Sequence, residues 1–262
     1  MKRLGIVALA ATAACSHMID SAIYGASDQA GRNVGASMVG NAGAPTGGAR
    51  NASYSGSMSM ASMNPAFLNM YMSFIFTYAF SSGGYDVAPV EYKPGQFTRW
   101  TGKGQDGKSI GIERAHLFDD AQGRQWWKVK FTDDENRTTI LEGLLDPKQQ
   151  KFVRMRAQFP DDKEGNEMPV DDQTYYHPAQ RLSRDSVEGA TKGIESVSVP
   201  AGHFKAKHVV FGGVDGKHEW WIDSKVPGGT VKQRLSGSGE DDRWEMELAA
   251  YGQNARRELG SK

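Results

Sequence analysis

The sequence predicts a mainly β protein: a curved antiparallel sheet or an unclosed β-barrel, with one N-terminal helix packed on or near it. Apolar and polar residues alternate along several segments after Tyr85, and this period of two is typical of strands with one buried face. Turn-forming residues separate these segments at short intervals, which favours a meander of neighbouring strands. An uncharged apolar stretch precedes them and has the flanking residues of a helix.

The alternation is clearest in three segments of the downstream half. In each, every second residue faces a predicted core while the residues between face water, as antiparallel sheets require. The segments are 126–131, 152–159 and 244–251. Loops rich in Asp, Gly and Asn are expected between strands at 106–108, 119–123, 132–136, 212–217 and 237–242. Residues 170–188 are expected to form a longer excursion whose form the pattern does not define.

The first fourteen residues have the pattern of a secretory signal peptide. Lys2 and Arg3 supply positive charge, and the apolar run 4–14 is too short to span a bilayer. Small residues lead from this run into Cys15, the single cysteine of the chain. The run resembles the bacterial lipobox, although Thr12 stands where Leu is usual. The resemblance implies cleavage before Cys15 and attachment of a lipid to its sulfur.

An ordinary signal peptide is the alternative at this site. Residues 11–13 read Ala-Thr-Ala, which is itself a cleavage pattern and would leave Cys15 as an unpaired thiol. Lipidation is favoured because a lone exported cysteine otherwise has no evident partner. Sorting to the outer membrane is implied by the same resemblance, since Ser16 rather than Asp follows the cysteine.

Composition divides the chain into four parts. These are a signal peptide (1–14), a flexible Gly/Ser/Ala/Met-rich tether (15–64), an apolar helix (65–84) and an antiparallel β domain (85–262). A Gly-rich tether of this length reaches about 35–40 Å. Basic and acidic residues number 31 each, so the formal net charge is zero. This balance argues against a nucleic-acid-binding protein.

The stretch 65–80 contains no charged residue. As a helix it would span about 24 Å, which is less than the roughly 30 Å hydrocarbon core of a membrane. Because it is apolar nearly all round, burial on more than one side is expected. The favoured interpretation is a helix packed on the open face of the β domain. The alternatives are a segment lying in the membrane interface or capping a ligand cavity.

Two tryptophan pairs lie in predicted strands, Trp126-Trp127 and Trp220-Trp221. Neighbouring strand residues point to opposite faces, so each pair places one indole on each face. Exposed indoles are unfavourable, which predicts that the 65–80 segment, a partner or a ligand covers both faces in part. The alternative is that the outer indole lies along Lys and Arg side chains. The candidate ligand-binding residues are Phe74, Phe76, Trp127 and Trp221.

The sequence offers no catalytic or metal-binding pattern. His203 and His208 fall on opposite faces of one predicted strand and cannot grip one metal together. The Asp pairs lack the spacing of a calcium loop, and no Gly-x-Ser-x-Gly motif occurs. Strand glutamates are expected on solvent faces, with no facing carboxylate pair among Glu142, Glu219, Glu245 and Glu247. We therefore expect no enzyme, no cofactor and no metal site.

Two downstream motifs resemble a known group of proteins. They are Val199-Pro200-Ala201-Gly202-His203-Phe204 and the stretch Trp221-Ile222 followed by Val226-Pro227. Both are similar to uncharacterised envelope lipoproteins of Gram-negative bacteria that are related to the periplasmic and outer-membrane lipoprotein-sorting fold group. The resemblance covers about residues 90–258 and implies a curved or unclosed antiparallel barrel with a helix near its mouth. Two departures are His203, where Thr or Ser is usual, and Gly228, where a larger apolar residue is frequent.

These features together predict a membrane-anchored bacterial lipoprotein with a non-catalytic β domain. The domain is expected to bind a hydrophobic ligand, either a lipid or the acyl chain of a lipoprotein. The alternative is a structural or interaction module of an envelope protein complex. The expected partners are the membrane, through the N-terminal lipid, and a lipid, lipoprotein or envelope protein, but no nucleic acid. The expected location is the outer membrane, facing the periplasm.

Overall fold

The computed structural model describes residues 85–87, 90–104, 109–160, 162–170, 180–213, 216–237 and 243–260. All of them belong to the second of two compact units, Met63–Lys262. The predicted signal peptide, tether and apolar helix lie outside the described residues, and so do Cys15, Phe74 and Phe76.

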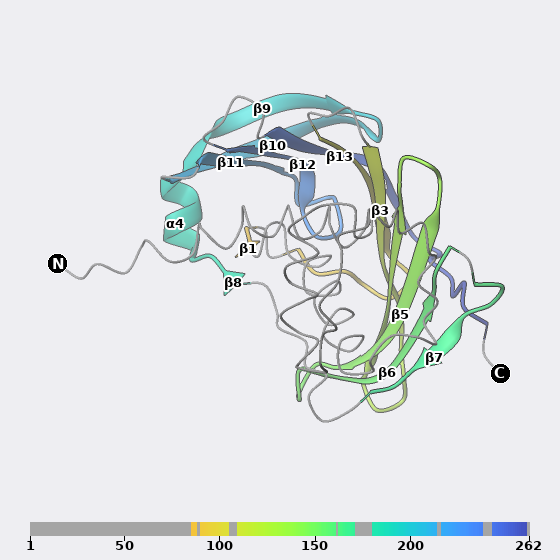
Figure 1. Ribbon diagram of the computed structural model, residues 1–262. Coiled ribbons are helices and arrows are strands. Elements are labelled where there is room, and N and C mark those ends of the chain that lie inside the picture. The colour runs from red at the N-terminus through yellow and green to blue at the C-terminus, as the bar shows by residue number, and fades with distance from the viewer. Residues whose placement is uncertain are drawn as a thin grey trace, which may run out of the picture. The chain divides into compact units, whose positions relative to one another are not determined.

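One antiparallel sheet of eleven strands dominates the described part of the chain (Figure 1). Its spatial order is β7-β6-β5-β4-β3-β2-β13-β12-β11-β10-β9. The strands are β2 (Phe97–Gly104), β3 (Ser109–Asp119), β4 (Gln125–Thr132), β5 (Thr138–Asp146), β6 (Lys151–Gln158), β7 (Asn166–Met168), β9 (Thr191–Val199), β10 (Gly202–Gly213), β11 (Gly216–Ile222), β12 (Thr230–Gly237) and β13 (Arg243–Gly252). The prediction of a mainly β, antiparallel and unclosed sheet is confirmed, and β7 and β9 form its two edges.

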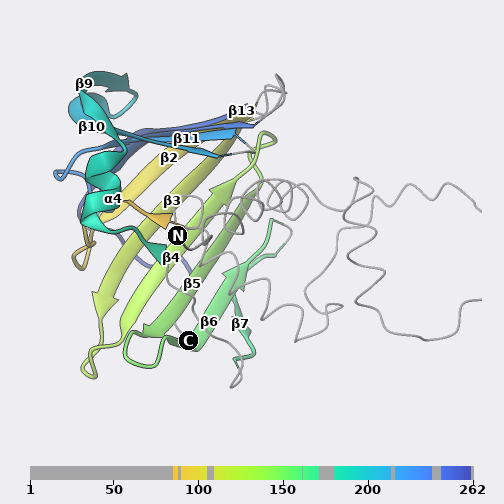
Figure 2. The ribbon, with the colours of Figure 1, turned by 90° about the vertical axis from the view of Figure 1, so that its left-hand side faces the viewer.

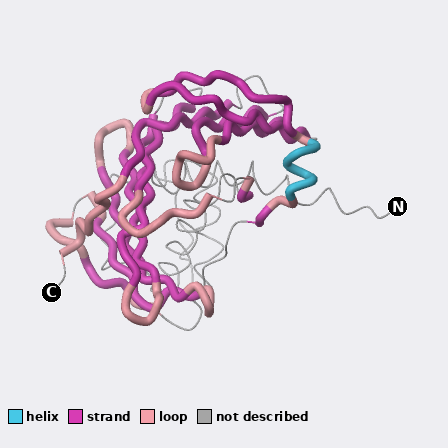
Figure 3. The backbone as a smooth tube through the Cα atoms, turned by 180° about the vertical axis from the view of Figure 1, so that it is seen from behind, coloured by secondary structure: helices cyan, strands magenta, loops and turns pink. Residues whose placement is uncertain are grey.

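The sheet consists of two meanders, β2 to β7 and β9 to β13. They join where β13 pairs with β2, in a register that runs from Trp244 opposite Gly104 to Gly252 opposite Phe97. Short turns connect β3 to β4, β4 to β5 and β5 to β6 (Figure 3). In the β3–β4 turn the Asp120 carboxylate accepts backbone hydrogen bonds from Gln122 and Arg124, and Asp133 plays the same part in the β4–β5 turn. The predicted loops at 119–123 and 132–136 are therefore confirmed.

Three short elements accompany the sheet. Strands β1 (Tyr85–Asp86) and β8 (Gln180–Arg181) pair in parallel, and helix α4 (Arg184–Gly189) precedes β9. Ser183 caps α4 by accepting the Ser186 backbone N–H, and the helix buries no residue. The undefined excursion at 170–188 thus contains β8 and all of α4 except Gly189, while its residues 171–179 are not described.

Strand alternation gives the sheet an apolar face and a charged face. The cross-strand registers keep the residues of each face on the same side of the sheet from β11 through β13 and β2 to β6. Each tryptophan pair is divided between the two faces, as the sequence predicts. The apolar face includes Trp100, Trp127, Val129, Leu141, Met155, Trp220 and Met246. The charged face includes Glu113, Trp126, Lys128, Glu142, Arg156, Trp221 and Lys232.

A cluster around Trp100 packs on the apolar face where the two meanders meet. Val226, Val231 and Leu248 are buried with Trp100, and Tyr92 packs against them. The turn before β12 reaches this cluster because Gly228 has a positive φ of 73° and donates its N–H to the Val90 carbonyl at 2.9 Å. A Cβ atom at position 228 would lie 2.8 Å from the Tyr92 ring. The packing against Tyr92 therefore requires glycine at position 228.

Residues 253–260, which we call the C-terminal strap, cross the charged face beside β3 to β6. Asn254 has a φ of 73°, which turns the chain out of β13, and the Ala255 N–H donates to the Gly95 carbonyl at 2.9 Å. Ala255 also packs against the cluster that contains Trp126. Leu259 is buried near the end of the strap, against Gly165. Figure 1 shows the chain ending on this side of the sheet, and Figure 2 shows β2 to β7 side by side from another direction.

Gly165→Ala tests the packing of Leu259 in the strap against Gly165. A Cβ atom at 165 would lie 2.9 Å from a Leu259 methyl carbon, so the strap has to shift. Such overpacking typically costs about 1–3 kcal/mol of unfolding free energy. Urea unfolding should show this loss for Gly165→Ala but not for Gly111→Ala, where the nearest atom to the new Cβ lies at 3.5 Å. Equal stability of the two variants would contradict this placement of Leu259.

Candidate interaction surface

A row of buried charges crosses β3 to β6 beneath the strap. Glu142 is fully buried, and Glu113, Lys128 and Arg156 are nearly so. Lys128 Nζ lies 2.8 Å from Glu113 Oε1 and 2.6 Å from Glu258 Oε1. The expectation that strand glutamates face solvent is wrong for Glu142 and for Glu219, which is also buried. Both are buried because neighbouring strands and the strap supply partners, which a single strand does not reveal.

The strap's main chain completes this row. Glu142 Oε1 accepts hydrogen bonds from the backbone N–H groups of Glu258 at 2.8 Å and Leu259 at 3.2 Å. The Leu259 carbonyl accepts a hydrogen bond from the Arg156 guanidinium at 2.6 Å. Removing one partner of a buried charge leaves the other charge desolvated and unpaired. Strap and charged face are therefore mutually dependent.

The ionisation of this cluster follows from its ion pairs. Burial acts to raise the pKa of Glu258, but hydrogen bonds and charge attraction from Lys128 and Lys130 outweigh it and hold the pKa below its usual value. The pKa of Glu113 is lowered in the same way, with Lys128 and Arg99 overcoming burial. Burial acts to lower the pKa of Lys128, but Glu113 and Glu258 together raise it. All three groups are charged when the strap is in place.

Trp221, a predicted ligand-binding residue, is held in a polar network on the charged face. Its indole N–H donates to Glu195 Oε2 at 2.9 Å, and its ring stacks on His208 with centroids 4.4 Å apart. His208 contacts Glu195 through Nδ1 at 2.8 Å and Glu219 through Nε2 at 3.1 Å. Arg234 lies over the same indole. The outer indole is thus covered by charged side chains, one of the two arrangements expected from the sequence.

Trp127, the second described candidate, lies on the opposite face. Its ring stacks on His116 at 4.4 Å and meets Tyr92 edge-on at 5.6 Å. His116 is itself held by the Tyr92 carbonyl and by Asp119. Trp127 and Trp221 therefore do not line one site. Phe74 and Phe76, the other two candidates, are outside the described residues.

His218 shows how a polar group is accommodated on the apolar face. Its ring stacks on Trp220 with centroids 3.7 Å apart, and burial lowers its pKa to about 3. Its Nε2 lies 2.6 Å from Gln233 Nε2, an amide nitrogen that can only donate, so His218 accepts there. The imidazole is neutral and tied to its neighbour. It is not placed to act on a ligand.

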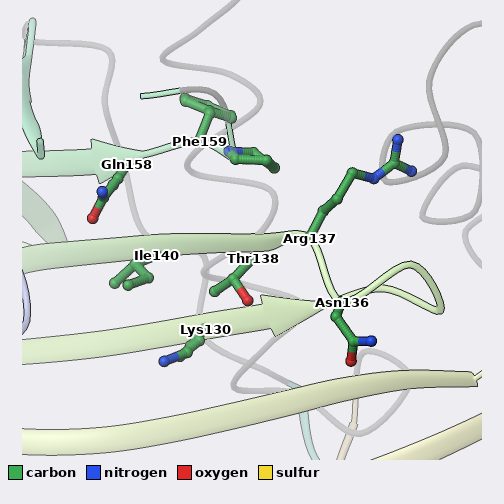
Figure 4. A pocket seen from close by; sticks show the side chains of 8 residues that line it. Lys130, Asn136, Arg137, Thr138, Ile140, Gln158 and Phe159 are labelled. Atoms are coloured by element: carbon green, nitrogen blue, oxygen red, sulfur yellow. The ribbon is translucent and has the colours of Figure 1, made fainter. Parts of the chain in front are cut away.

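A hollow of about 500 Å³ opens beside the β4–β5 turn (Figure 4). Its walls are largely polar, and both of its cations are already paired: Lys130 with Glu258 and Arg137 with Asp133. The lining residues are Lys130, Asn136, Arg137, Thr138, Ile140, Gln158, Phe159 and Pro160. This chemistry does not suit an acyl chain. Within the described ranges no three His, Cys, Asp or Glu side chains are grouped to hold a metal ion.

The edge strand β9 is the most open part of the described sheet. One side of β9 pairs with β10, whereas its other side borders no further strand of the sheet. None of its side chains is buried, and Ile194 is 74% exposed. The other edge, β7, has three residues, and its Glu167 pairs with Arg154 and Arg156. Long unprotected edges are templates for pairing with another chain.

Exposed lysines beside Ile194 give one face of this edge a basic character, while Glu195 lies on the other face with His208 and Trp221. Lys207 lies opposite Ile194 and Lys205 lies opposite Ser196, so they share one face of the β9–β10 hairpin. Lys192, also exposed, precedes Ile194 on β9 itself. Sequence reasoning missed this surface because edge position depends on which strands pair. The local signal available was a strand-like run, residues 194–199, that lacks a fully apolar side.

Glu258→Gln tests the charge row through pH. Because the folded pKa of Glu258 lies below its unfolded value of 4.5, its contribution to stability is present above 4.5 and is lost as the pH falls below it. Glu258→Gln should lower the unfolding free energy at neutral pH and flatten its decline in acid. Exposed Glu164→Gln should leave the wild-type profile intact. Urea unfolding across this pH range provides the measurement, and an unchanged profile for Glu258→Gln would contradict the ion pairs.

No protein-family model matches the chain, and no curated protein matches its sequence. Solved structures do show similarity of fold. A protein assigned as exported, with a YmcC-like fold, from Bacteroides fragilis is 11% identical, with a TM-score of 0.32, 63% of this chain and 98% of that chain covered. A protein assigned as a lipoprotein from Parabacteroides distasonis is 10% identical, with a TM-score of 0.32 and 62% and 97% covered.

The third similar structure is the MucA/MucB complex of Pseudomonas aeruginosa. Its matching chain is 10% identical, with a TM-score of 0.36 and coverage of 62% of this chain and 52% of that one. The resemblance to the lipoprotein-sorting fold group stays a prediction. Similarity at this level is too low to transfer a family or a function to this chain.

Among the described residues, no helix is long and apolar enough to cross a membrane.

Proposed function

We propose that this chain is a lipid-anchored protein of the bacterial cell envelope whose β domain is a non-catalytic module for binding an envelope protein. The observation that carries the proposal is the open edge strand β9, with nine residues and a 74% exposed Ile194. A partner segment in extended conformation would add to this edge as a further strand. Main-chain hydrogen bonds supply affinity in such complexes, and alternate side chains supply specificity.

The surface around β9 defines the chemistry of that partner. Lys192, Lys205 and Lys207 are exposed beside Ile194. An added strand whose residues on this one face, at every second position, include both apolar and acidic side chains would place an apolar side chain on Ile194 and carboxylates near the lysines. Opposite charges of this kind favour encounter and fix register. We therefore assign an acidic, extended protein segment as the occupant of the β9 edge.

Two further observations favour this module over a lipid carrier. The apolar face over β4 to β6 is closed, because Val129, Leu141 and Met155 have no exposed surface. Over β3 to β6 the charged face is covered by the strap. Carriage of a lipid or lipoprotein acyl chain is the second candidate, and the apolar character of the face that carries Trp127 and Trp220 favours it.

The anchor and the binding domain serve separate purposes in this proposal. A lipid on Cys15 would hold the chain at the membrane, and the tether 15–64 would let the domain reach partners about 35–40 Å away. Outer-membrane attachment facing the periplasm is part of the same proposal. Non-catalytic binding at β9 needs no cofactor.

Ile194→Asp and Lys207→Glu test strand addition at β9. A photoreactive residue at Ser196 should form a stoichiometric crosslink in cells to one envelope protein, at a segment rich in acidic residues. Either substitution should lower the yield at least about tenfold by setting like charges against each other. Val153→Asp is the matched control, because Val153 is an exposed aliphatic residue in β6, which lies between β5 and β7. Equal yields in all variants, or crosslinks to lipid alone, would contradict the proposal.

Cys15→Ser tests the anchor. A fatty-acid analogue fed to cells should label the wild-type chain, which should fractionate with membranes. The serine variant should lose the label and leave the membrane fraction, because serine offers no sulfur for the thioether. Membrane fractionation and in-gel detection of the analogue provide the readouts. Label that persists in Cys15→Ser would overturn lipidation at this residue.

A further inference from the structure

The apolar face over β4 to β6 is buried beyond what the described residues explain. Val129, Leu141, Met155 and Ala157 have no exposed surface, and Met168 on β7 is 5% exposed. In a single sheet, side chains on a face stay accessible unless another layer covers them. The strap lies on the opposite face, because it binds Glu142 and Arg156.

The described elements outside the sheet do not supply that layer. Helix α4 buries no residue, and β1 and β8 have two residues each. The segment around Tyr92 and the turn containing Val226 pack on the Trp100 cluster, where β2 meets β13. The face from β4 to β7 therefore needs a second layer of apolar side chains from elsewhere.

We propose that residues 65–80 of this chain form that second layer. These sixteen residues contain no charge and include Phe67, Phe74, Ile75, Phe76 and Phe80. A segment apolar nearly all round needs burial on more than one side, and a closed apolar face needs a covering layer. Packing residues 65–80 on this face would bury the segment and cover the face at the same time.

The chain path supports this occupant over others. The chain runs along the apolar face directly after the segment, because the Val90 carbonyl accepts the Gly228 N–H and Tyr92 packs against Trp127 on β4. Two strand spacings separate β4 from β6, or about 10 Å. The ten residues from Phe80 to Val90 can span up to about 33 Å. Residues 65–80 are therefore within reach of the whole surface.

This inference is independent of strand addition at β9. It places the segment on the face and leaves the edge free, so either proposal can fail without the other. It also bears on the second candidate function, since an acyl chain on this face would have to displace residues 65–80. An acyl chain and a second copy of the protein are the competing occupants.

Photocrosslinking in the full exported chain tests the inference. With p-benzoylphenylalanine in place of Phe74, irradiation should give an intramolecular crosslink in the monomer band, which mass spectrometry should map to peptides that contain Leu141, Met155 or Met168. The same replacement at Met60, in the tether, is the control and should give no crosslink to β4 to β6. Crosslinks from position 74 to lipid, to a second copy or to the charged face would overturn the proposal. The absence of any crosslink from position 74 would also overturn it.

A second variant pair keeps the test independent of crosslinking chemistry. Phe74→Asp with Phe76→Asp should uncover the apolar face and raise the fluorescence of bound 8-anilinonaphthalene sulfonate several-fold, while circular dichroism reports whether the strands persist. Met58→Asp with Met60→Asp introduces the same charges in the tether and should leave dye binding unchanged. Equal dye binding by both double variants would contradict the proposal.

Discussion

The packing of the C-terminal strap on the charged face depends on the fully buried carboxylate of Glu142. A buried charge needs partners, and here Oε1 accepts hydrogen bonds from the backbone N–H groups of Glu258 and Leu259, while Oε2 lies 3.8 Å from Arg257 Nε. Lys128 and Arg156 are drawn into the same arrangement on neighbouring strands. The result is a face closed by the chain's own C-terminal strap, which links residues more than a hundred positions apart in the sequence.

With that face closed, the remaining chemistry of the described domain lies at its margins. Trp221 and His208 are bound by carboxylates, Trp127 stacks on His116 and meets Tyr92 edge-on, and His218 is neutral and buried. These residues serve the fold. The β9 edge differs because its backbone borders no further strand of the sheet and its side chains are all accessible. A module that binds through an added strand is the function that requires least change in this structure.

Local pattern predicted much of the fold, and non-local pairing limited the rest. Alternation at 126–131, 152–159 and 244–251 was sufficient to place β4, β6 and β13, because the period of two along a strand depends only on neighbouring residues. The strap was missed because residues 253–260 have no period and gain their role from Glu142. Likewise, the β2–β13 pairing and the exposure of β9 depend on which strands meet. Alternation divides each tryptophan pair between the faces, but only the pairing of strands from β4 to β11 reveals that Trp127 and Trp221 lie on opposite faces.

The central claim is that both faces of the sheet are buried over β4 and β5 while the β9 edge is open. Hydrogen–deuterium exchange of the full chain tests this most directly, because it reports the protection of each backbone segment. The account predicts slow exchange in β4, in β5 and at the Glu258 and Leu259 amides, with fast exchange at alternate amides of β9. Protection of β9 equal to that of β4, or free exchange of the strap, would contradict it.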